Sequence, residues 1–150
     1  MSRGFLEVEK EYLKNSKETI MPKRGSAKSA GYDFHVKEKI TLKPNDKIVV
    51  FSDVRAFMDS DEVLNLYPRS SMGIKKHIRI TNGTGVIDSD YFNNPETGGN
   101  IGIALHNFGE KTIEIQAGER VCQGVFSRYL ITDDDDASGF RNGGIGSTGK

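Results

Sequence analysis

Apolar and polar residues alternate with a period of two along much of the chain. Six segments show this pattern and predict strands, at residues 31–36, 47–51, 62–67, 101–108, 112–115 and 120–130. Turn-forming segments separate them at residues 43–46, 81–85, 93–100 and 108–111. No segment carries a sustained 3.6-residue apolar stripe, and the candidates for a short helix are residues 12–19 and 58–63. The pattern predicts an all-β sandwich, jelly roll or barrel of antiparallel strands.

Chain length, net charge and cysteine content limit the kinds of molecule that the protein could bind and the compartment that it suits. A chain of 150 residues fits one domain, and its 21 basic and 21 acidic residues cancel, which argues against long nucleic acid but leaves room for a small anion. No apolar stretch reaches the 18 residues of a membrane span, and the N-terminus lacks a signal-peptide pattern. The single cysteine, Cys122, predicts a buried thiol in a reducing compartment. A soluble, cytoplasmic protein without a membrane partner is expected.

Zinc chemistry and covalent catalysis find little support. His35, His77 and His106 are far apart, with no cysteine or carboxylate at metal-ligand spacing. No G-x-S-x-G motif occurs, and Cys122 lies inside a predicted strand.

The segment GVIDSDYF, residues 85–92, carries two carboxylates at positions i and i+2. On a strand, Asp88 and Asp90 would share one face and could serve as a general base or a metal shell. An exposed turn with solvated acids explains the same residues equally well.

Two further segments could bind phosphate. In YPRSSMGIKK, residues 67–76, Arg69 stands beside Ser70 and Ser71, a set that binds phosphate or forms an ordinary turn. The chain ends in RNGGIGSTGK, residues 141–150, with the glycine and lysine spacing of a P-loop but without the helix that a P-loop needs. Arg141 and the glycine-flanked amides could still bind an anion, or the segment is a frayed end. The acidic run 133–136 reads as a solvated connector before it.

Taken in order, these segments resemble the five motifs of the trimeric dUTPases (deoxyuridine 5'-triphosphate nucleotidohydrolases). The matching segments are AGYDF (30–34), PRSSMG (68–73), GVIDSDY (85–91), GERVCQGVF (118–126) and RNGGIGSTG (141–149). The resemblance implies a distorted jelly-roll β-barrel over residues 1–136 and a flexible glycine-rich C-terminal arm over residues 137–150. It also implies a homotrimer with shared active sites: motifs 1, 2 and 4 from one subunit, motif 3 from another and motif 5 from the third.

The resemblance implies hydrolysis of dUTP to dUMP and pyrophosphate with Mg²⁺. Asp88 would be the general base, and Asp33 would act on the metal through water. The Tyr91 ring would lie under the deoxyribose, and uracil would be read by a hairpin that contains Asn82, Gly85 and Val86. The remaining substrate contacts would come from Arg69, Ser70, Ser71, Gln123, Arg141, Gly144, Ile145, Gly146, Ser147 and Thr148.

Three departures from the family pattern are visible, and one is that the start of the fifth motif, RN before GG, is a residue shorter than the common form. Ile145 stands where the fifth motif usually has an aromatic residue, so stacking on uracil would be lost. The segment after Tyr91, residues 92–100, is longer than the usual turn and is expected to be a surface loop. Two alternatives stay open: a dCTP deaminase-like enzyme of the same fold, which usually lacks the GGxGSTG ending, and a dUTPase-like regulator that binds nucleotide without turnover.

Overall fold

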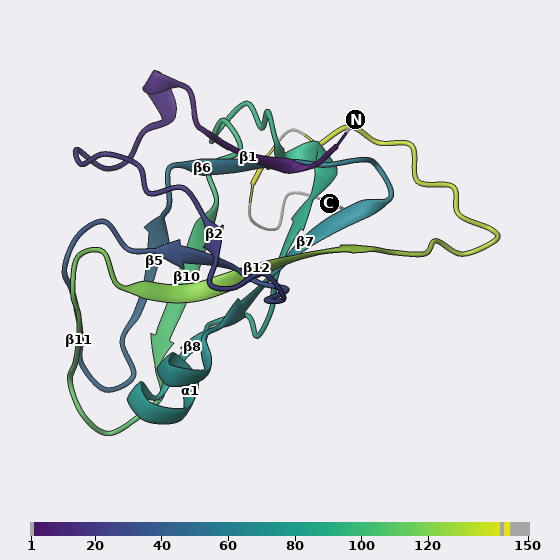
Figure 1. Ribbon diagram of the computed structural model, residues 1–150. Helices are drawn as coiled ribbons and strands as arrows, with labels where there is room; N and C mark the ends of the chain where they lie inside the picture. Colours follow the sequence, from purple (N-terminus) through teal and green to yellow (C-terminus); the bar gives the residue numbers. More distant parts are fainter. Residues whose placement is uncertain (1, 142, 145–150) are drawn as a thin grey trace.

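The structure is a computed structural model, and it describes residues 2–141, 143 and 144. Within these residues the chain forms twelve strands, one α-helix and two short 3-10 helices (Figure 1). Every strand pairing among them is antiparallel. The predicted all-β class is confirmed.

The strands form four sheets. The largest has the order β2 (Lys23–Arg24), β3 (Tyr32–His35), β12 (Arg120–Arg128), β7 (Glu62–Pro68) and β9 (Gly85–Asp88). A second sheet has the order β5 (Lys47–Phe51), β10 (Gly102–Asn107) and β8 (Ile78–Ile80). Two strand pairs complete the fold, β1 (Gly4–Glu7) with β6 (Val54–Phe57) and β11 (Ile113–Ile115) with β4 (Ile40–Leu42).

All six predicted strands are present, with ends shifted by at most two residues. The alternation missed the short strands, β1, β2, β4, β6, β8 and β9, because two to four residues are too few to display a period.

Both helix candidates were wrong. The α-helix, α1, spans Ser70–Lys76, and the 3-10 helices are η1 (Lys10–Tyr12) and η2 (Ser89–Tyr91). Helix α1 has two turns and buries only Met72, so it leaves no apolar stripe in the sequence. It ends at His77, which adopts the left-handed conformation (φ 53°), and the cations of Lys75 and Lys76 lie at its negative end.

The core lies between the sheets and follows the alternation. Leu64 and Leu66 of β7 face inward with Phe34 of β3 and Cys122 of β12, all nearly free of solvent contact. The predicted burial of Cys122 is confirmed. Gly124 lies among them because a β-carbon there would come within 2.9 Å of the Leu64 side chain.

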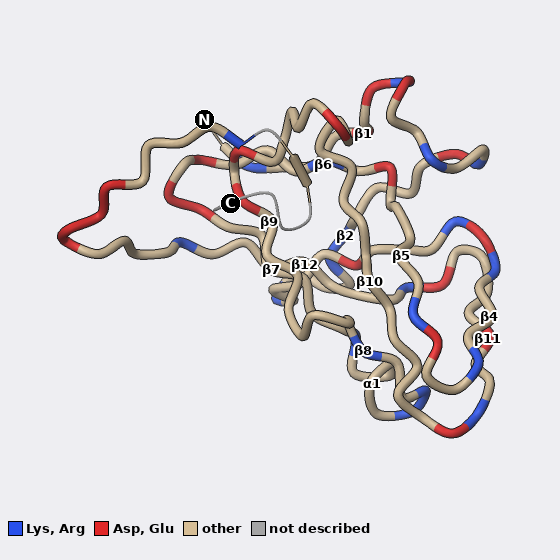
Figure 2. Tube along the Cα trace, turned by 180° about the vertical axis from the view of Figure 1, so that it is seen from behind, with Lys and Arg blue, Asp and Glu red and all other residues tan. Residues whose placement is uncertain are grey.

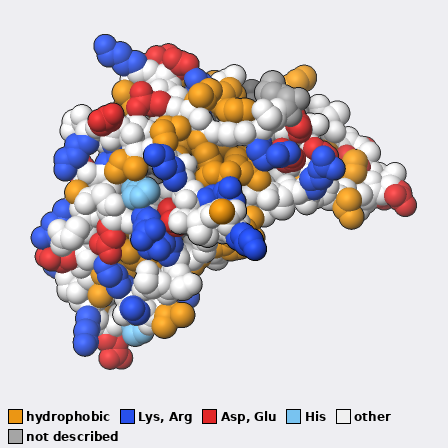
Figure 3. Space-filling model, in the orientation of Figure 1, with side chains coloured by type: hydrophobic (Ala, Val, Ile, Leu, Met, Phe, Trp, Pro, Cys, Tyr) orange, Lys and Arg blue, Asp and Glu red, His pale blue; other side chains and the backbone are white. Residues whose placement is uncertain are grey.

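An aromatic cluster closes one end of this core. The Phe5 ring of β1 lies 5.3 Å from the rings of both Tyr32 and Phe126. Figure 3 shows apolar side chains gathered on this face, bordered by lysine and arginine side chains. The N-terminal strand therefore covers the large sheet rather than extending it.

After β12 the chain leaves the body of the molecule as a long exposed segment and then returns to it (Figures 1 and 2). The acidic run 133–136 lies at its tip and is exposed, as a solvated connector requires. The division into a domain, 1–136, and an arm, 137–150, stays a prediction. None of the helices in the described ranges is long and apolar enough to cross a membrane.

Candidate functional site

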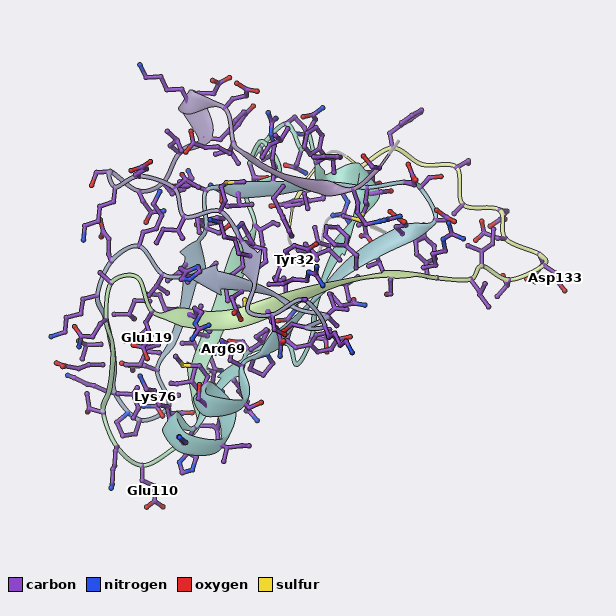
Figure 4. All side chains as sticks on the ribbon, in the orientation of Figure 1. Tyr32, Arg69, Lys76, Glu110, Glu119 and Asp133 are labelled. Atoms are coloured by element: carbon purple, nitrogen blue, oxygen red, sulfur yellow. The ribbon has the colours of Figure 1, made fainter. Side chains whose placement is uncertain are left out.

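A first cavity of about 380 Å³ lies where β3, β12 and the start of α1 meet. Strand β12 runs between β3 and β7, so Gln123 pairs with Asp33 on one side and with Tyr67 on the other. Arg69 follows directly after β7, and Figure 4 shows it at the entry to α1. The cavity is lined by Gly25, Ser29, Gly31, Asp33, Arg69, Ser70, Ser71, Arg120 and Gln123. The fold thus brings together five residues of the expected phosphate and metal site, and we call this space the phosphate cavity.

One carboxylate stands between two guanidinium groups in the phosphate cavity. Asp33 Oδ1 lies 3.3 Å from Arg69 Nε, and Asp33 Oδ2 lies 3.3 Å from Arg120 Nη1. The two arginines exceed the charge of the single acid, so the cavity favours an anion. Sequence reasoning missed Arg120, although it stands three residues before Gln123 in the same motif.

Gly31 has no side chain, and this leaves room for Gln123. A β-carbon at Gly31 would lie 2.3 Å from Gln123 Oε1 and 2.9 Å from its Cβ. No side chain fits there unless Gln123 moves, so the glycine of AGYDF sets the place of the glutamine amide in the cavity.

Two neighbouring cavities, of about 230 and 490 Å³, are both lined by residues of β9. They share Val86, Ile87, Gly102, Arg141 and Gly144. Tyr91 lines the smaller cavity, and Asn82 and Gly85 line the larger one. The expected uracil and sugar residues therefore meet around one strand, and we call this pair of spaces the nucleoside cavity.

The turn before β9 differs from the hairpin that was expected. Strand β8 pairs with β10 while β9 pairs with β7, so residues 81–84 connect two sheets. Gly83 takes a positive φ of 81°, and the Asn82 side chain donates to the Thr84 carbonyl at 3.3 Å. The turn is tight because its glycine adopts the positive φ that it requires and its asparagine side chain hydrogen-bonds to the turn's own backbone.

Arg141 holds both candidate carboxylates. Asp88 ends β9, whereas Asp90 lies in η2, so the predicted common strand face is wrong. Arg141 Nη2 nevertheless donates to Asp88 Oδ2 at 2.7 Å, and its Nε lies 3.2 Å from Asp90 Oδ1. The guanidinium also lies 5.7 Å from the centre of the Tyr91 ring. The arm therefore contacts motif 3 of its own chain, and its expected crossing to a neighbour stays a prediction.

Asp88 is open to water although it is paired. Its side chain is 47% exposed, whereas that of Arg141 is 11% exposed. A solvent molecule can therefore reach the free side of the Asp88 carboxylate, as general-base catalysis requires.

The two cavities lie apart in the single chain. Asp88 pairs with Val63, and Gln123 pairs with Tyr67, four residues further along β7. Four residues of strand and two strand spacings separate Asp88 from Gln123 by about 16 Å between α-carbons. The candidate base and the phosphate cavity are therefore separate half-sites, since no residue in the described part of the chain lines both the phosphate cavity and the nucleoside cavity.

The acid groups do not form a metal cage. In the part of the chain that the structure describes, no group of three histidine, cysteine or acidic residues is placed to hold an ion. Asp33 is a single carboxylate on the wall of the phosphate cavity. This donor set fits Mg²⁺, which keeps most of its waters and takes phosphate oxygens as ligands. The expected contacts Ile145, Gly146, Ser147 and Thr148 lie outside the described residues.

Comparison with known proteins adds an independent finding. A family model described as dUTPase matches residues 17–149. The chain is 42% identical to the deoxyuridine 5'-triphosphate nucleotidohydrolase of Lactococcus lactis subsp. lactis, over 98% of this chain and 97% of the relative. It is 35% identical to the enzyme of that name from Mus musculus, over 93% of this chain and 84% of the relative.

Solved structures agree. The dUTPase from Streptococcus mutans superimposes with a TM-score of 0.76 at 41% identity, covering 87% of this chain and 98% of that one. A variant dUTPase from phage phi11 of S. aureus, whose structure describes the coordination of a structural Mg(II) ion, shares the fold with a TM-score of 0.71 at 22% identity. It covers 93% of this chain and 99% of that one.

Proposed function

The chain belongs to the dUTPase family, and from that premise we propose how its residues carry out the hydrolysis of dUTP to dUMP and pyrophosphate. Two observations carry the proposal. Asp88 is paired with Arg141, which lines the nucleoside cavity together with Tyr91. A separate phosphate cavity holds two arginines beside one carboxylate.

Asp88 is the general base. It takes a proton from a water molecule whose oxygen attacks the α-phosphorus of dUTP. The bond from that phosphorus to the bridging oxygen breaks, and pyrophosphate leaves. The exposed side of the carboxylate supports this role, and a placed base contributes on the order of 10²–10⁴ in rate.

The phosphate chain lies in the phosphate cavity. Arg69 and Gln123 supply charged and amide donors there, and Ser70 and Ser71 supply hydroxyl donors. Arg120 adds a second cation beside Asp33. Charge-assisted hydrogen bonds of this kind fix the leaving pyrophosphate and the α-phosphorus relative to the base.

The nucleoside cavity selects the base and the sugar. Backbone groups around Asn82, Gly85 and Val86 read uracil, and cytosine leaves them unpaired. The Tyr91 ring lies under the deoxyribose and rejects a 2'-hydroxyl. Its own hydroxyl donates to the Asn100 carbonyl at 2.8 Å, which fixes the ring.

Mg²⁺ is the cofactor. Asp33 would hold it through a water molecule. When bound, the ion would supply positive charge that offsets the negative charge of the leaving pyrophosphate.

The active form is a homotrimer with shared sites, and the protein acts in the cytoplasm. The separation of the two cavities within one chain supports the sharing, because the phosphate cavity of one subunit and the nucleoside cavity of another can face each other.

Pyrophosphate release from dUTP, dCTP, dTTP and UTP with Mg²⁺, with each reaction also assayed for ammonia, tests the proposal. Turnover of dUTP alone is expected. Ammonia from dCTP would identify a deaminase, and binding of dUTP without release of pyrophosphate would identify a regulator.

A further inference from the structure

The loop between η2 and β10, residues 93–100, supplies two hydrogen-bond partners to the Tyr91 hydroxyl. The Tyr91 O–H donates to the backbone carbonyl of Asn100 at 2.8 Å, and Thr97 Oγ1 lies 3.0 Å from the Tyr91 oxygen. Because the Tyr91 proton is already used, the Thr97 hydroxyl is the donor in the second bond. One loop therefore holds the hydroxyl end of the Tyr91 ring from two sides.

A second acceptor lies within reach of the Thr97 hydroxyl. The Oδ1 of the buried Asn94 is 3.2 Å from Thr97 Oγ1. That oxygen already accepts hydrogen bonds from the backbone N–H groups of Glu96 (3.0 Å) and Thr97 (3.1 Å). A carboxamide oxygen has two lone pairs, and both are used by these bonds. The single Thr97 proton is therefore directed to the nearer Tyr91 oxygen.

The Asn100 carbonyl is an acceptor with a fixed position. Asn100 is fully buried, and both ends of its side chain are bonded. Its Oδ1 accepts from the Asp53 backbone N–H at 2.9 Å, and its Nδ2 donates to Asp53 Oδ1 at 2.8 Å and to the Tyr12 carbonyl at 3.0 Å. Since Asp53 is itself paired with the buried Lys37, the acceptor of the Tyr91 proton cannot shift without breaking a buried network.

The bond from Thr97 adds a second direction to this anchor. Tyr91 and Thr97 both line the smaller space of the nucleoside cavity. A single hydrogen bond to a carbonyl tolerates a broad range of directions, so the bond to Asn100 alone leaves the ring free to tilt. A ring that lies under the sugar rejects a 2'-hydroxyl only if it cannot tilt away from that group.

We propose that Thr97 is a positioning residue that acts through the Tyr91 hydroxyl and sets the selectivity of the enzyme for deoxyribose over ribose. This inference rests on the proposed function, in which the Tyr91 ring lies under the sugar. It also assigns a role to the loop of residues 93–100, which carries both partners of the hydroxyl. Without the Thr97 bond the ring tilts more easily, and the 2'-hydroxyl of UTP is admitted more often.

Three substitutions of threonine isolate this bond. Thr97→Val removes the hydroxyl and keeps the branched shape of the side chain. Thr97→Ser keeps the hydroxyl and should retain the selectivity of the wild type. The matched control is Thr41→Val, because Thr41 is exposed on β4, which pairs with β11 in a sheet separate from β9.

The variant Tyr91→Phe separates action through the hydroxyl from a general loosening of the loop. Phenylalanine offers no oxygen to Thr97, so adding Thr97→Val to Tyr91→Phe should change the selectivity no further. Thr97→Val also removes the acceptor of a bond from the Gly99 backbone N–H, at 3.3 Å. If that loss were the cause, Thr97→Val would have the same effect with Tyr91 as with phenylalanine at this position.

Selectivity is measured in two ways, as the ratio of kcat/KM for dUTP to that for UTP and as the ratio of the dissociation constants of their non-hydrolysable imido analogues. Thr97→Val is expected to reduce the preference for deoxyribose roughly three- to tenfold in both measurements, the effect of one hydrogen bond. Thr97→Ser and Thr41→Val should match the wild type. Tyr91→Phe should reduce the preference at least as much as Thr97→Val, and it tests the same hydroxyl if circular dichroism shows that Thr97→Val does not fold.

An unchanged preference in Thr97→Val, or in Tyr91→Phe, would overturn the inference. An equal effect of Thr97→Val with and without the Tyr91 hydroxyl would overturn it as well. These results are distinct from a failure of the proposed function, in which the wild type would release no pyrophosphate from dUTP. The comparison of analogue binding needs no turnover and remains valid in that case.

Discussion

Replacing Asp53 by asparagine tests whether a buried ion pair supports the loop that borders the nucleoside cavity. Asp53 is fully buried, and its Oδ2 lies 3.0 Å from Nζ of the equally buried Lys37. Its backbone N–H donates to Asn100 Oδ1 at 2.9 Å, at the end of the loop of residues 93–100. Asp53 has a positive φ of 59°, a conformation that asparagine also adopts, so the substitution adds no backbone strain.

The magnitude follows from the contacts. The two carboxylate oxygens accept hydrogen bonds from the Lys14 and Asn15 backbones and from three side chains, Asn15, Lys37 and Asn100. An asparagine keeps one accepting oxygen and turns an amide donor toward the other donors, which leaves the Lys37 charge buried and unpaired. Removal of one partner of a buried ion pair costs about 3–5 kcal/mol. For a chain of this size the expected fall in Tm is about 6–20 °C.

The pH dependence has a definite sign. Burial acts to raise the pKa of Asp53, but the hydrogen bonds from Asn15, Lys14, Asn100 and Lys37 outweigh it and hold the pKa below its ordinary value of 3.8. A lowered pKa means that this stabilisation is present above about pH 4 and is lost as the pH falls through the folded-state value. Asp53→Asn should therefore lose the most stability, relative to the wild type, at neutral pH.

Thermal unfolding followed by circular dichroism, at one protein concentration and at pH 7 and pH 3, measures both effects. Asp134→Asn, in the exposed acidic run, is the control and should match the wild type. The double variant Lys37→Met with Asp53→Asn should regain part of the lost stability, because no buried charge remains unpaired. A Tm for Asp53→Asn within about 2 °C of the wild-type Tm would correspond to a loss of at most about 1 kcal/mol. That result would refute the reasoning.

Three further predictions concern the site and the core. Gly31→Ala should displace the Gln123 amide and lower kcat/KM for dUTP by roughly 10- to 100-fold, because one hydrogen bond to a charged group is lost. Circular dichroism should show an intact fold. Wild-type kinetics would show that Gln123 does not hold the phosphates. Truncation after Asp136 should leave a folded protein, since the last strand ends at Arg128, with dUTP hydrolysis reduced at least about tenfold; an unchanged rate would make the arm a frayed end. Burial raises the pKa of the Cys122 thiol, so iodoacetamide should leave this thiol unmodified in the native protein at pH 8 and label it fully in denaturant. Mass spectrometry measures the labelling. Rapid labelling of the native protein would contradict the place of Cys122 in the core.

The sequence predicted the elements with a clear period and missed those without one. The seven residues of β7 and the nine of β12 display their alternation, whereas β2 has two residues. The sequence did not predict helix α1, because Met72 is its one buried residue and a single apolar position shows no helical period. Composition also concealed the buried part of the 93–100 loop, since asparagine is normally exposed. Asn94 is buried because its carboxamide oxygen accepts from two backbone N–H groups and its Nδ2 donates to a backbone carbonyl.

The site divides in the same way. The sequence motifs predicted Asp88, Arg69 and Gln123 as site residues, because the order of the five motifs along the chain is specific to the family. Two features depend on the fold instead: Arg120 reaches Asp33 from the next strand, and Arg141 reaches Asp88 from 53 residues away. No local pattern encodes contacts of that range.

The most direct test of the account compares dUTP hydrolysis by the wild type and by Asp88→Asn, with binding of a non-hydrolysable dUTP analogue measured on both. Asparagine keeps the shape and cannot take the proton. We expect pyrophosphate release to fall by roughly 10²–10⁴-fold while the analogue still binds. Full turnover by Asp88→Asn would remove Asp88 from the role of base and would contradict the mechanism at its centre.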